Sequence, residues 1–244
     1  MRVLNLFTPA RRELGVLEAA ELLGKPKSTT SRWLSGMEEA GFLERDPETA
    51  KYHVSLKLAA IGEMARQATS LQQRAYPALQ RITESTGETS NLVLLVGNEG
   101  TNVEAVPSPQ PVAHLGLVGK RFPLYASAAG KALLAWRPEP EIRQLAPKPL
   151  ERITRTTITD FDVLLRDLEE VRERGWSVNW KEYEPDLVGV GAPVRDHRGD
   201  VVAALSISAP ASRVSRAQLP KLGAHVAGAA AGLSATLGYR EAAA

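Results

Sequence analysis

The chain has 244 residues, which is enough for one large domain or two modest ones, and its formal net charge is only +2. Any surface that binds nucleic acid must therefore be local. The absence of cysteine excludes disulfides, thiolate zinc sites and cysteine nucleophiles. No run of about 18 apolar residues is present to cross a membrane, and the N-terminus lacks the apolar core of a secretory signal. We therefore expect a cytoplasmic protein without membrane association.

The pattern of apolar residues divides the chain near residue 70. The predicted elements of the first part are helices at 2–7, 15–23 and 28–40, followed by a β-hairpin at 42–55 around the turn Pro-Glu-Thr-Ala. From Leu56 to Thr86 the pattern is helical again. Interruptions at Ser70 and Pro77 predict two helices or one that bends.

The second part alternates strands with helices. The predicted elements are strands at 91–96 and 101–106, helices at 127–136 and 160–174, strands at 176–180, 187–195 and 201–209, and a closing helix at about 215–238. Tight turns join several of the strands in pairs. This order predicts a mostly antiparallel sheet packed with helices.

The helix at 28–40 has two different sides. Its inner stripe, predicted to pack on the helix at 15–23, consists of Thr30, Trp33, Leu34 and Met37. Its outer side carries Ser28, Arg32, Ser35 and Glu39, with Thr29 at the border. Free amides and the partial positive charge at a helix start suit a phosphate group, and Lys25 and Lys27 add full charges there.

Three helices followed by a hairpin predict a winged helix-turn-helix, in which Arg32 can reach a guanine edge and the hairpin tip contacts the flanking backbone. The candidate DNA-binding residues are Lys27, Ser28, Thr29, Thr30, Arg32, Arg45 and Lys51. The alternative interpretation is that Ser28 only caps the helix and Arg32 is a solvated charge. The group as a whole favours DNA, because no acidic residue lies between Glu21 and Glu38.

Segments along nearly the whole chain resemble the isocitrate-lyase-regulator (IclR) family of bacterial transcription factors. The run KPKSTTSRWLSGMEEAGFLERDPETAKYHVS is similar to that family's recognition helix and wing. The matching segments downstream are FPLYASAAGKALLA, TRTTITD, LEEVRERGWSV, EYEPDLVGVGAPVRD and VVAALSISAPASR. Two features depart from the family pattern: the stretch 1–14 is short, and Ala50 stands at a wing-tip position that is commonly glycine.

The resemblance implies an α+β protein with a winged helix-turn-helix domain at 1–55, a linker helix at 56–70 and a GAF-like α/β effector-binding domain at 71–244. It also implies a homodimer or homotetramer that binds a palindromic double-stranded DNA operator, with affinity modulated by a small organic effector. Neither a cofactor nor a metal is expected.

The strand at 201–209 presents two faces. Val201, Ala203, Leu205 and Ile207 form an ordinary core face, and the opposite face pairs Val202 and Ala204 with Ser206 and Ser208. Small residues and hydroxyls can line a cavity, but a wet outer face would look the same. The resemblance favours the cavity, because the family's effector site uses the matching serines.

By the same match, Ala128 and Ala129 offer backbone amides at a helix start, Gly189 leaves room for the ligand, and Asn179 replaces an aspartate found in relatives that bind small oxo-acids. These groups are mostly uncharged donors, so the expected effector bears a carboxylate, carbonyl or amide. Trp176 and Trp180 are interpreted as core, with Trp180 as a possible cavity wall.

Other motifs do not indicate catalysis. Ala-Gly-Lys at 129–131 lacks the upstream glycine of a phosphate-binding loop. The four histidines are scattered without metal-ligand spacing, and we expect the acidic residues Glu182, Glu184 and Asp186 to be solvated. An enzyme is therefore not expected. The alternative function is a small-molecule-transforming enzyme, or a metabolite-binding protein, whose N-terminal module only mediates assembly.

Overall fold

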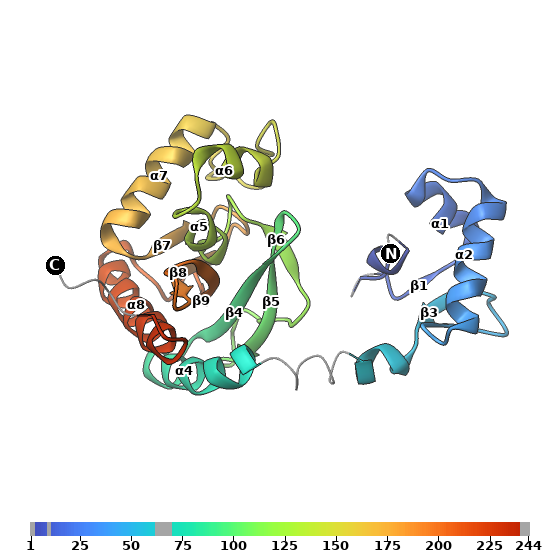
Figure 1. Cartoon of the computed structure of the whole chain (residues 1–244), viewed down its shortest axis with the longest axis horizontal. Coiled ribbons are helices and arrows are strands. Elements are labelled where there is room, and N and C mark those ends of the chain that lie inside the picture. Colours follow the sequence, from blue (N-terminus) through green and yellow to red (C-terminus); the bar gives the residue numbers. More distant parts are fainter. Residues whose placement is uncertain (1–2, 9–10, 62–69, 240–244) are drawn as a thin grey trace. The chain divides into compact units, whose positions relative to one another are not determined.

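The computed structural model describes residues 3–8, 11–61 and 70–239. The chain forms two compact units, residues 1–69 and 70–244, which are described separately (Figure 1). The first is helical with a small sheet and the second is a larger sheet covered by helices, which confirms the α+β class. No helix within the described ranges is long and apolar enough to span a membrane.

The first unit has the helix-turn-helix and hairpin that the sequence predicts. Its elements are η1 (Leu4–Leu6), β1 (Glu13–Leu14), α1 (Val16–Leu23), α2 (Lys27–Glu39), β2 (Leu43–Arg45) and β3 (Tyr52–Val54), with 56–61 again helical. Gly24 ends α1 with a left-handed φ of 59°, which a glycine adopts without strain. Leu34 and Tyr52 pack with Val3 and Ala19 in the core of this unit.

Two details of this unit differ from the prediction. A single 3-10 turn, η1, takes the place of the helix predicted at 2–7, of which residue 2 lies outside the described residues. The short strand β1 pairs with β3, so the hairpin becomes a three-stranded sheet in the order β1-β3-β2. Two residues are too few to produce an alternating pattern that could have predicted this strand.

The second unit is built on one six-stranded sheet. Its elements are α4 (Ser70–Thr86), β4 (Thr89–Val96), β5 (Glu99–Val106), β6 (Arg121–Pro123), α5 (Ala128–Leu134), α6 (Glu139–Leu145), α7 (Phe161–Arg174), β7 (Ser177–Trp180), β8 (Leu187–Arg195), β9 (Val201–Pro210), η2 (Arg216–Gln218) and α8 (Leu219–Thr236). The strand order is β6-β5-β4-β9-β8-β7. All five pairings are antiparallel, as predicted.

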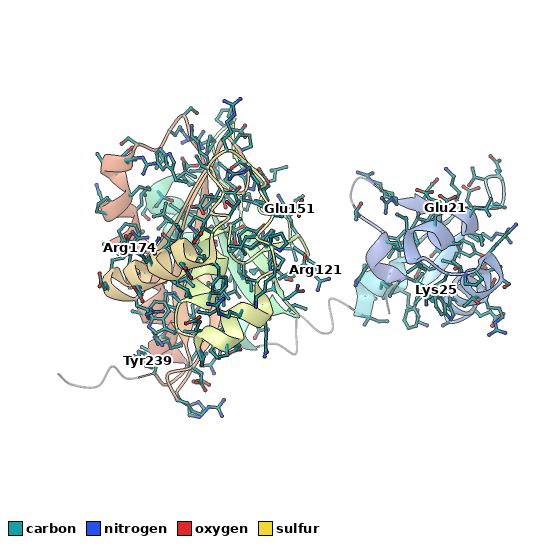
Figure 2. All side chains as sticks on the ribbon, turned by 90° about the horizontal axis from the view of Figure 1, so that it is seen from above. Glu21, Lys25, Arg121, Glu151, Arg174 and Tyr239 are labelled. Carbon is teal, nitrogen blue, oxygen red and sulfur yellow. The ribbon has the colours of Figure 1, made fainter. Side chains whose placement is uncertain are left out.

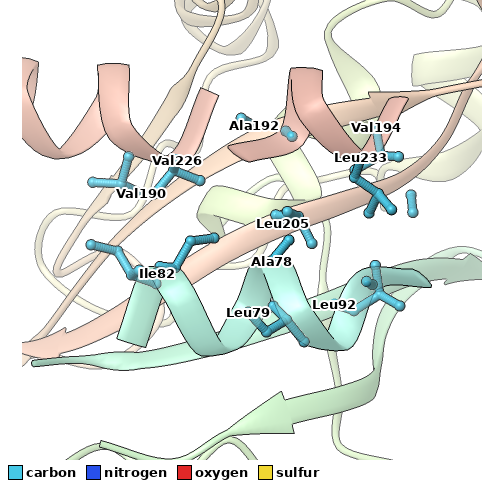
Figure 3. Close-up of a cluster of buried hydrophobic side chains, with 14 of the residues drawn as sticks. Ala78, Leu79, Ile82, Leu92, Val190, Ala192, Val194, Leu205, Val226 and Leu233 are labelled. Carbon is cyan, nitrogen blue, oxygen red and sulfur yellow. The ribbon is translucent and has the colours of Figure 1, made fainter. Parts of the chain in front are cut away.

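Helices cover both faces of this sheet (Figure 1). On one face α4 and α8 pack on the strands, and Figure 3 shows Ile82, Leu205 and Val226 meeting in that core. On the other face α5 and α7 form a second core around Leu133, Leu168 and their neighbours. The sheet is therefore the central layer of three.

The helical region at 56–86 agrees with the prediction where it is described, and two short elements were not predicted. Helix α4 begins at Ser70 and continues through Pro77 without ending there. A proline costs the helix one hydrogen bond, but the buried side chains of Ala75, Ala78 and Leu79 on either side of it hold the helix against the sheet. The predicted linker at 56–70 falls largely on residues 62–69, outside the described residues. The short elements β6 and α6 had no periodic signal in the sequence.

Candidate functional site

The start of α2 presents an exposed polar and basic surface. Lys27, Ser28 and Arg32 are exposed and Thr29 is half-buried. The residue before the helix is Pro26, and no side chain caps the first turn, so the interpretation of Ser28 as a cap is wrong. Within the described part of the chain, Lys27 and Arg32 take part in no ion pair, which leaves both cations available to phosphate groups.

Thr30 does not belong to this surface. Its side chain is completely buried, so the prediction that it contacts DNA is wrong. Thr30 lies one turn before Leu34, also fully buried, on the side of α2 that meets α1. The same stripe was expected to include Trp33, which is instead 41% exposed. Trp33 lies at the edge of the stripe and lines an apolar hollow beside Leu23 and Met37.

The wing places two further cations at its tip. Arg45, at the end of β2, and Lys51, just before β3, are both exposed. The Arg45 Nε donates to the carbonyl of Ala50 at 3.4 Å, and its guanidinium lies 5.6 Å from the centre of the Tyr52 ring. Figure 2 shows the side chains of this unit, with Lys25 and Glu21 labelled near the turn between α1 and α2.

A cavity in the second unit brings together all six residues predicted to bind the effector. It is lined by Ala128, Ala129, Asn179, Gly189, Ser206 and Ser208, together with Asn91, Asn102, His114, Lys120, Phe122, Ser127, Tyr183, Leu187 and Ile207. Its empty volume is about 440 Å³ when the open mouth is included. A concave site with several convergent polar groups is typical of a small-molecule site.

Strand register explains why these residues meet. Asn179 on β7 faces Gly189 on β8, which in turn faces Ser208 on β9. One row along, Gly191 faces Ser206 in the same way. Side chains two residues apart share a face, so both rows lie under α5.

The two glycines of β8 allow α5 to approach the sheet. A Cβ atom at Gly191 would lie 2.8 Å from the carbonyl carbon of Ala128, closer than such atoms can come. A Cβ at Gly189 would lie 3.3 Å from the Cβ of Ala128, which is tight but tolerable. The start of α5 is therefore held directly over the sheet. The amides of Ala128 and Ala129 have no acceptor within their own helix.

Hydrogen bonds inside the cavity orient its polar groups as donors. Asn91 Nδ2 donates to Ser208 Oγ at 3.2 Å, so the Ser208 hydroxyl hydrogen is free to point into the cavity. Asn179 Oδ1 accepts the backbone N–H of Glu182 at 2.7 Å, so the Asn179 NH₂ group is left to donate. The cavity therefore offers hydrogen-bond donors from two sides, the strands and the start of α5.

The mouth of the cavity carries charge that the sequence analysis did not foresee. The Lys120 Nζ lies 2.9 Å from Glu184 Oε1 and 5.2 Å from the centre of the Tyr183 ring. The His114 Nδ1 lies 3.4 Å from Glu184 Oε2. Burial lowers the pKa of His114, and the nearby Glu184 only partly opposes this effect. His114 and Lys120 lie between β5 and β6, where no periodic signal marks them.

Glu182 also departs from the sequence prediction, because it is buried and not solvated. Its carboxylate lies 2.7 Å from the Nζ of Lys131, which is 1% exposed. Burial raises the pKa of Glu182, and the attraction of Lys131 opposes that rise. Lys131 and Glu182 are about fifty residues apart in the sequence, so no local pattern could predict that they form an ion pair.

The remaining expectations for the sheet are mostly confirmed. Trp176 and Trp180 pack against the core under α4 and α8, and Trp180 does not line the cavity, so its role as a cavity wall is wrong. On β9, Ala203, Leu205 and Ile207 form the predicted core face, whereas Val201 packs on the opposite core. The register shift where Arg195 pairs with Val201 turns that side chain over. Among the described residues, no group of three or more His, Asp or Glu side chains is placed to hold a metal ion.

Comparisons with known proteins agree in both units. The family model described as bacterial transcriptional regulator IclR C-terminal matches residues 64–235, and that of the IclR helix-turn-helix domain matches residues 1–47. The HTH-type transcriptional regulator XynR of Escherichia coli (strain K12) is 31% identical over 240 residues, which cover 98% of this chain and 95% of XynR. KdgR of the same strain, also an HTH-type transcriptional regulator, is 35% identical over 231 residues, covering 94% and 88%.

A solved structure extends the likeness to a ligand-bound protein. It is that of an IclR homolog from Microbacterium hydrocarbonoxydans complexed with 4-hydroxybenzoate. It superposes with a TM-score of 0.80 at 28% identity and covers 97% of this chain and 96% of that one.

Proposed function

The chain belongs to the IclR family of ligand-responsive, DNA-binding transcriptional regulators, and from this premise we propose that it binds a palindromic operator as a homodimer or homotetramer. A small organic effector in the cavity under α5 modulates that binding. The observation that carries the proposal is the convergence of Ala128, Ala129, Asn179, Gly189, Ser206 and Ser208 on one cavity. A regulator of this kind acts on DNA in the cytoplasm.

The exposed start of α2 supports the proposed DNA contacts. Arg32 lies one turn into the helix, where it can read a base edge in the major groove, while Lys27, Ser28 and Thr29 meet the phosphates. Arg45 and Lys51 of the wing contact the adjacent backbone. One such helix covers few base pairs, so two copies engage half-sites about 34 Å apart, or a multiple of that distance.

The donor groups of the cavity support an effector with an acceptor. Two backbone amides, the Asn179 NH₂ and two serine hydroxyls face the cavity. Lys120 also lines it, and its charge is paired with Glu184. A carboxylate satisfies several such donors at once, and a carbonyl or an amide satisfies fewer. The 4-hydroxybenzoate bound by the Microbacterium protein is itself a small carboxylate, in keeping with this class.

A calorimetric titration of the full chain tests the ligand class. The panel pairs small carboxylates, among them acetate, pyruvate, benzoate and 4-hydroxybenzoate, with amines of matching size. We expect at least one carboxylate to bind and its amine partner to fail, because an ammonium group can only donate and would face other donors. Binding of amines in preference to every carboxylate would overturn the proposed ligand class.

The role of an enzyme is not part of this proposal. The relatives named above are transcriptional regulators, and the cavity groups are explained by binding alone. Release of the effector chemically unchanged after incubation with the protein is the expected outcome, checked by mass spectrometry of the ligand recovered from the calorimeter cell.

A further inference from the structure

A polar cluster outside the cavity lining binds the backbone of residues 181 and 182, which follow Asn179 in the sequence. We propose that its threonines, Thr154 and Thr157, and the buried Lys131 are positioning residues for effector recognition, although none of them lines the cavity. They hold the turn after β7 so that Asn179 can only donate into the cavity. This inference rests on the proposed function, because it assigns a recognition role to groups outside the same site.

The threonine hydroxyls hydrogen-bond to the backbone of the turn at residues 181 and 182. The hydroxyls of Thr154 and Thr156 each donate to the carbonyl of Lys181 at 2.7 Å, and that of Thr157 donates to the carbonyl of Glu182 at 2.7 Å. Three hydroxyls of one short loop thus bind two consecutive carbonyls. Thr157 is buried, so its hydrogen bond is shielded from water.

Lys181, whose carbonyl accepts two of these hydrogen bonds, has an unfavourable backbone conformation. Lys181 has a φ of 61°, in the left-handed region that residues with a Cβ rarely adopt. Such a conformation persists only where the surroundings hold it in place. The threonine hydroxyls are bound to the carbonyl of this residue and of the next.

The buried ion pair ties the same turn to α5. Lys131 Nζ lies 2.7 Å from Glu182 Oε2 and 2.9 Å from Asp167 Oδ2, and it donates to the carbonyl of Val178 at 3.1 Å. Lys131 is in α5, whose first amides form the opposite wall of the cavity. The two walls are therefore connected through one buried cation, and removal of its partners would leave that charge uncompensated.

The consequence for recognition follows from a single hydrogen bond. The Glu182 N–H donates to Asn179 Oδ1, and this occupies the acceptor end of the carboxamide. With the turn held, the cavity presents only the NH₂ end of Asn179. If the turn relaxes, the carboxamide can rotate and present its oxygen, which would repel a carboxylate and accept a donor instead.

Hydrogen exchange of the Glu182 amide in the full chain tests the positioning without any ligand. The variant is Thr157→Val, which keeps the shape and removes the hydroxyl. We expect exchange of the Glu182 amide to speed up by about three- to ten-fold, as the loss of one buried hydrogen bond implies. The buried β9 amides, such as that of Leu205, should keep their rates. Thr157→Ser, which restores a hydroxyl, should restore slow exchange.

The matched control is Thr159→Val, in the same loop. The Thr159 hydroxyl accepts from Arg152 at 3.2 Å and, among the described residues, is not hydrogen-bonded to the carbonyls of residues 181 and 182, so exchange at Glu182 should not change. An unchanged Glu182 rate in Thr157→Val, or an equal rise at Leu205, would overturn the positioning role. The first result would show that the hydroxyl holds nothing, and the second that it serves only global stability.

A binding experiment tests the role in recognition, with benzoate and benzamide as probes. Each is measured against the wild type, Thr157→Val and the double variant Lys131→Met/Glu182→Gln, which removes the charges of Lys131 and Glu182 together and leaves the partly exposed Asp167. We expect preference for the carboxylate over the amide to fall by about three- to ten-fold in both variants. An unchanged preference alongside faster exchange would refute the recognition role. If benzoate fails to bind even the wild type, other carboxylates that bind from the calorimetric panel replace it. Failure of the whole panel refutes the proposed ligand class, while the exchange result still decides the positioning.

Discussion

Ala50 at the tip of the wing has a φ of 55°, in the left-handed region where glycine is at ease and alanine is not. The alanine Cβ destabilises this backbone conformation by about 1–2 kcal/mol, and glycine removes that strain. Glycine also raises the conformational entropy of the unfolded chain, which lowers the stability of the folded state by about 0.5–1 kcal/mol. We expect Ala50→Gly to raise the stability of the first unit by up to about 1 kcal/mol. Native-state hydrogen exchange of buried amides in the first unit, such as that of Leu34, measures the change.

The control for this substitution is Ala40→Gly, at the end of α2. Ala40 has an ordinary right-handed φ of −74°, so glycine there should only add entropy to the unfolded chain and lower the stability. Equal destabilisation by both substitutions would contradict the interpretation of Ala50 as a strained position.

His114 makes the stability of the second unit depend on pH. Burial holds its folded pKa below the ordinary value of 6.5, so the folded state binds the proton less tightly than the unfolded state. The contribution is therefore fully present above pH 6.5 and is lost as the pH falls from there through the folded pKa. We expect His114→Gln to flatten the fall in melting temperature over that window. A slope equal to that of the wild type would contradict the account.

The burial of Thr30 and Glu182 was not predicted from their residue types. The helical pattern placed Thr30 on the inner stripe, and its burial follows from that geometry, so its assignment to DNA from residue type alone was wrong. Glu182 stood in an acidic, turn-like segment that suggests solvent. Its partner Lys131 is distant in sequence, and only the fold brings the two together. Long-range pairing of charges has no local signature.

At the scale of elements, the contact between α5 and β8 depends on Gly191. A methyl group there would lie 2.8 Å from the Ala128 carbonyl carbon, so Gly191→Ala must push the helix away. We expect it to cost about 1–3 kcal/mol of stability, as overpacking in a core does, and to weaken effector binding by moving the α5 amides. Thermal unfolding and calorimetry measure the two effects.

Gly189→Ala is the matched comparison on the same strand. Its methyl group would meet the Ala128 Cβ at 3.3 Å, which a small shift relieves. We expect a smaller loss of stability but a reduced cavity volume, and hence a selective loss of the larger ligands. Equal losses of stability in the two variants would show that the α5 contact is not specific to Gly191.

The proposed DNA contacts of helix α2 assign base reading and phosphate binding to different residues. Arg32→Ala should cost about 1–3 kcal/mol on the operator and relax selectivity at one base position, whereas Lys27→Ala should weaken binding to all sequences alike and flatten the salt dependence. Competition binding with operator and random duplexes at graded salt measures both. Equal losses on operator and random DNA for Arg32→Ala would exclude base reading.

At the scale of the whole molecule, much of the architecture could be predicted from the sequence. The amphipathic helix α7 and the strands β4, β5, β8 and β9 follow from periodicity, helix α8 follows from its Ala- and Leu-rich composition, and tight turns predict the antiparallel pairing of the strands. Short elements such as β1, β6 and α6 could not be predicted, because tertiary pairing and not local pattern forms them. The six candidate cavity residues came from resemblance, while His114, Lys120 and Tyr183 required the fold.

We propose that a small molecule bound under α5 controls DNA binding. Fluorescence anisotropy of the promoter-region duplex beside its own gene, titrated with the full chain with and without the carboxylate found by calorimetry, tests this coupling. The wild type is compared with the double variant Ser206→Ala/Ser208→Ala. Each lost hydrogen bond should weaken the ligand by about 0.5–1.5 kcal/mol, or about 1.5–3 kcal/mol where the ligand atom is charged.

We expect both proteins to bind the duplex equally without the ligand. The ligand should shift the affinity of the wild type, and the double variant should need a much higher ligand concentration for the same shift. A double variant that responds at the same ligand concentration as the wild type would refute the effector site, and a wild type whose affinity for the duplex the bound ligand leaves unchanged would refute the control of DNA binding by the ligand.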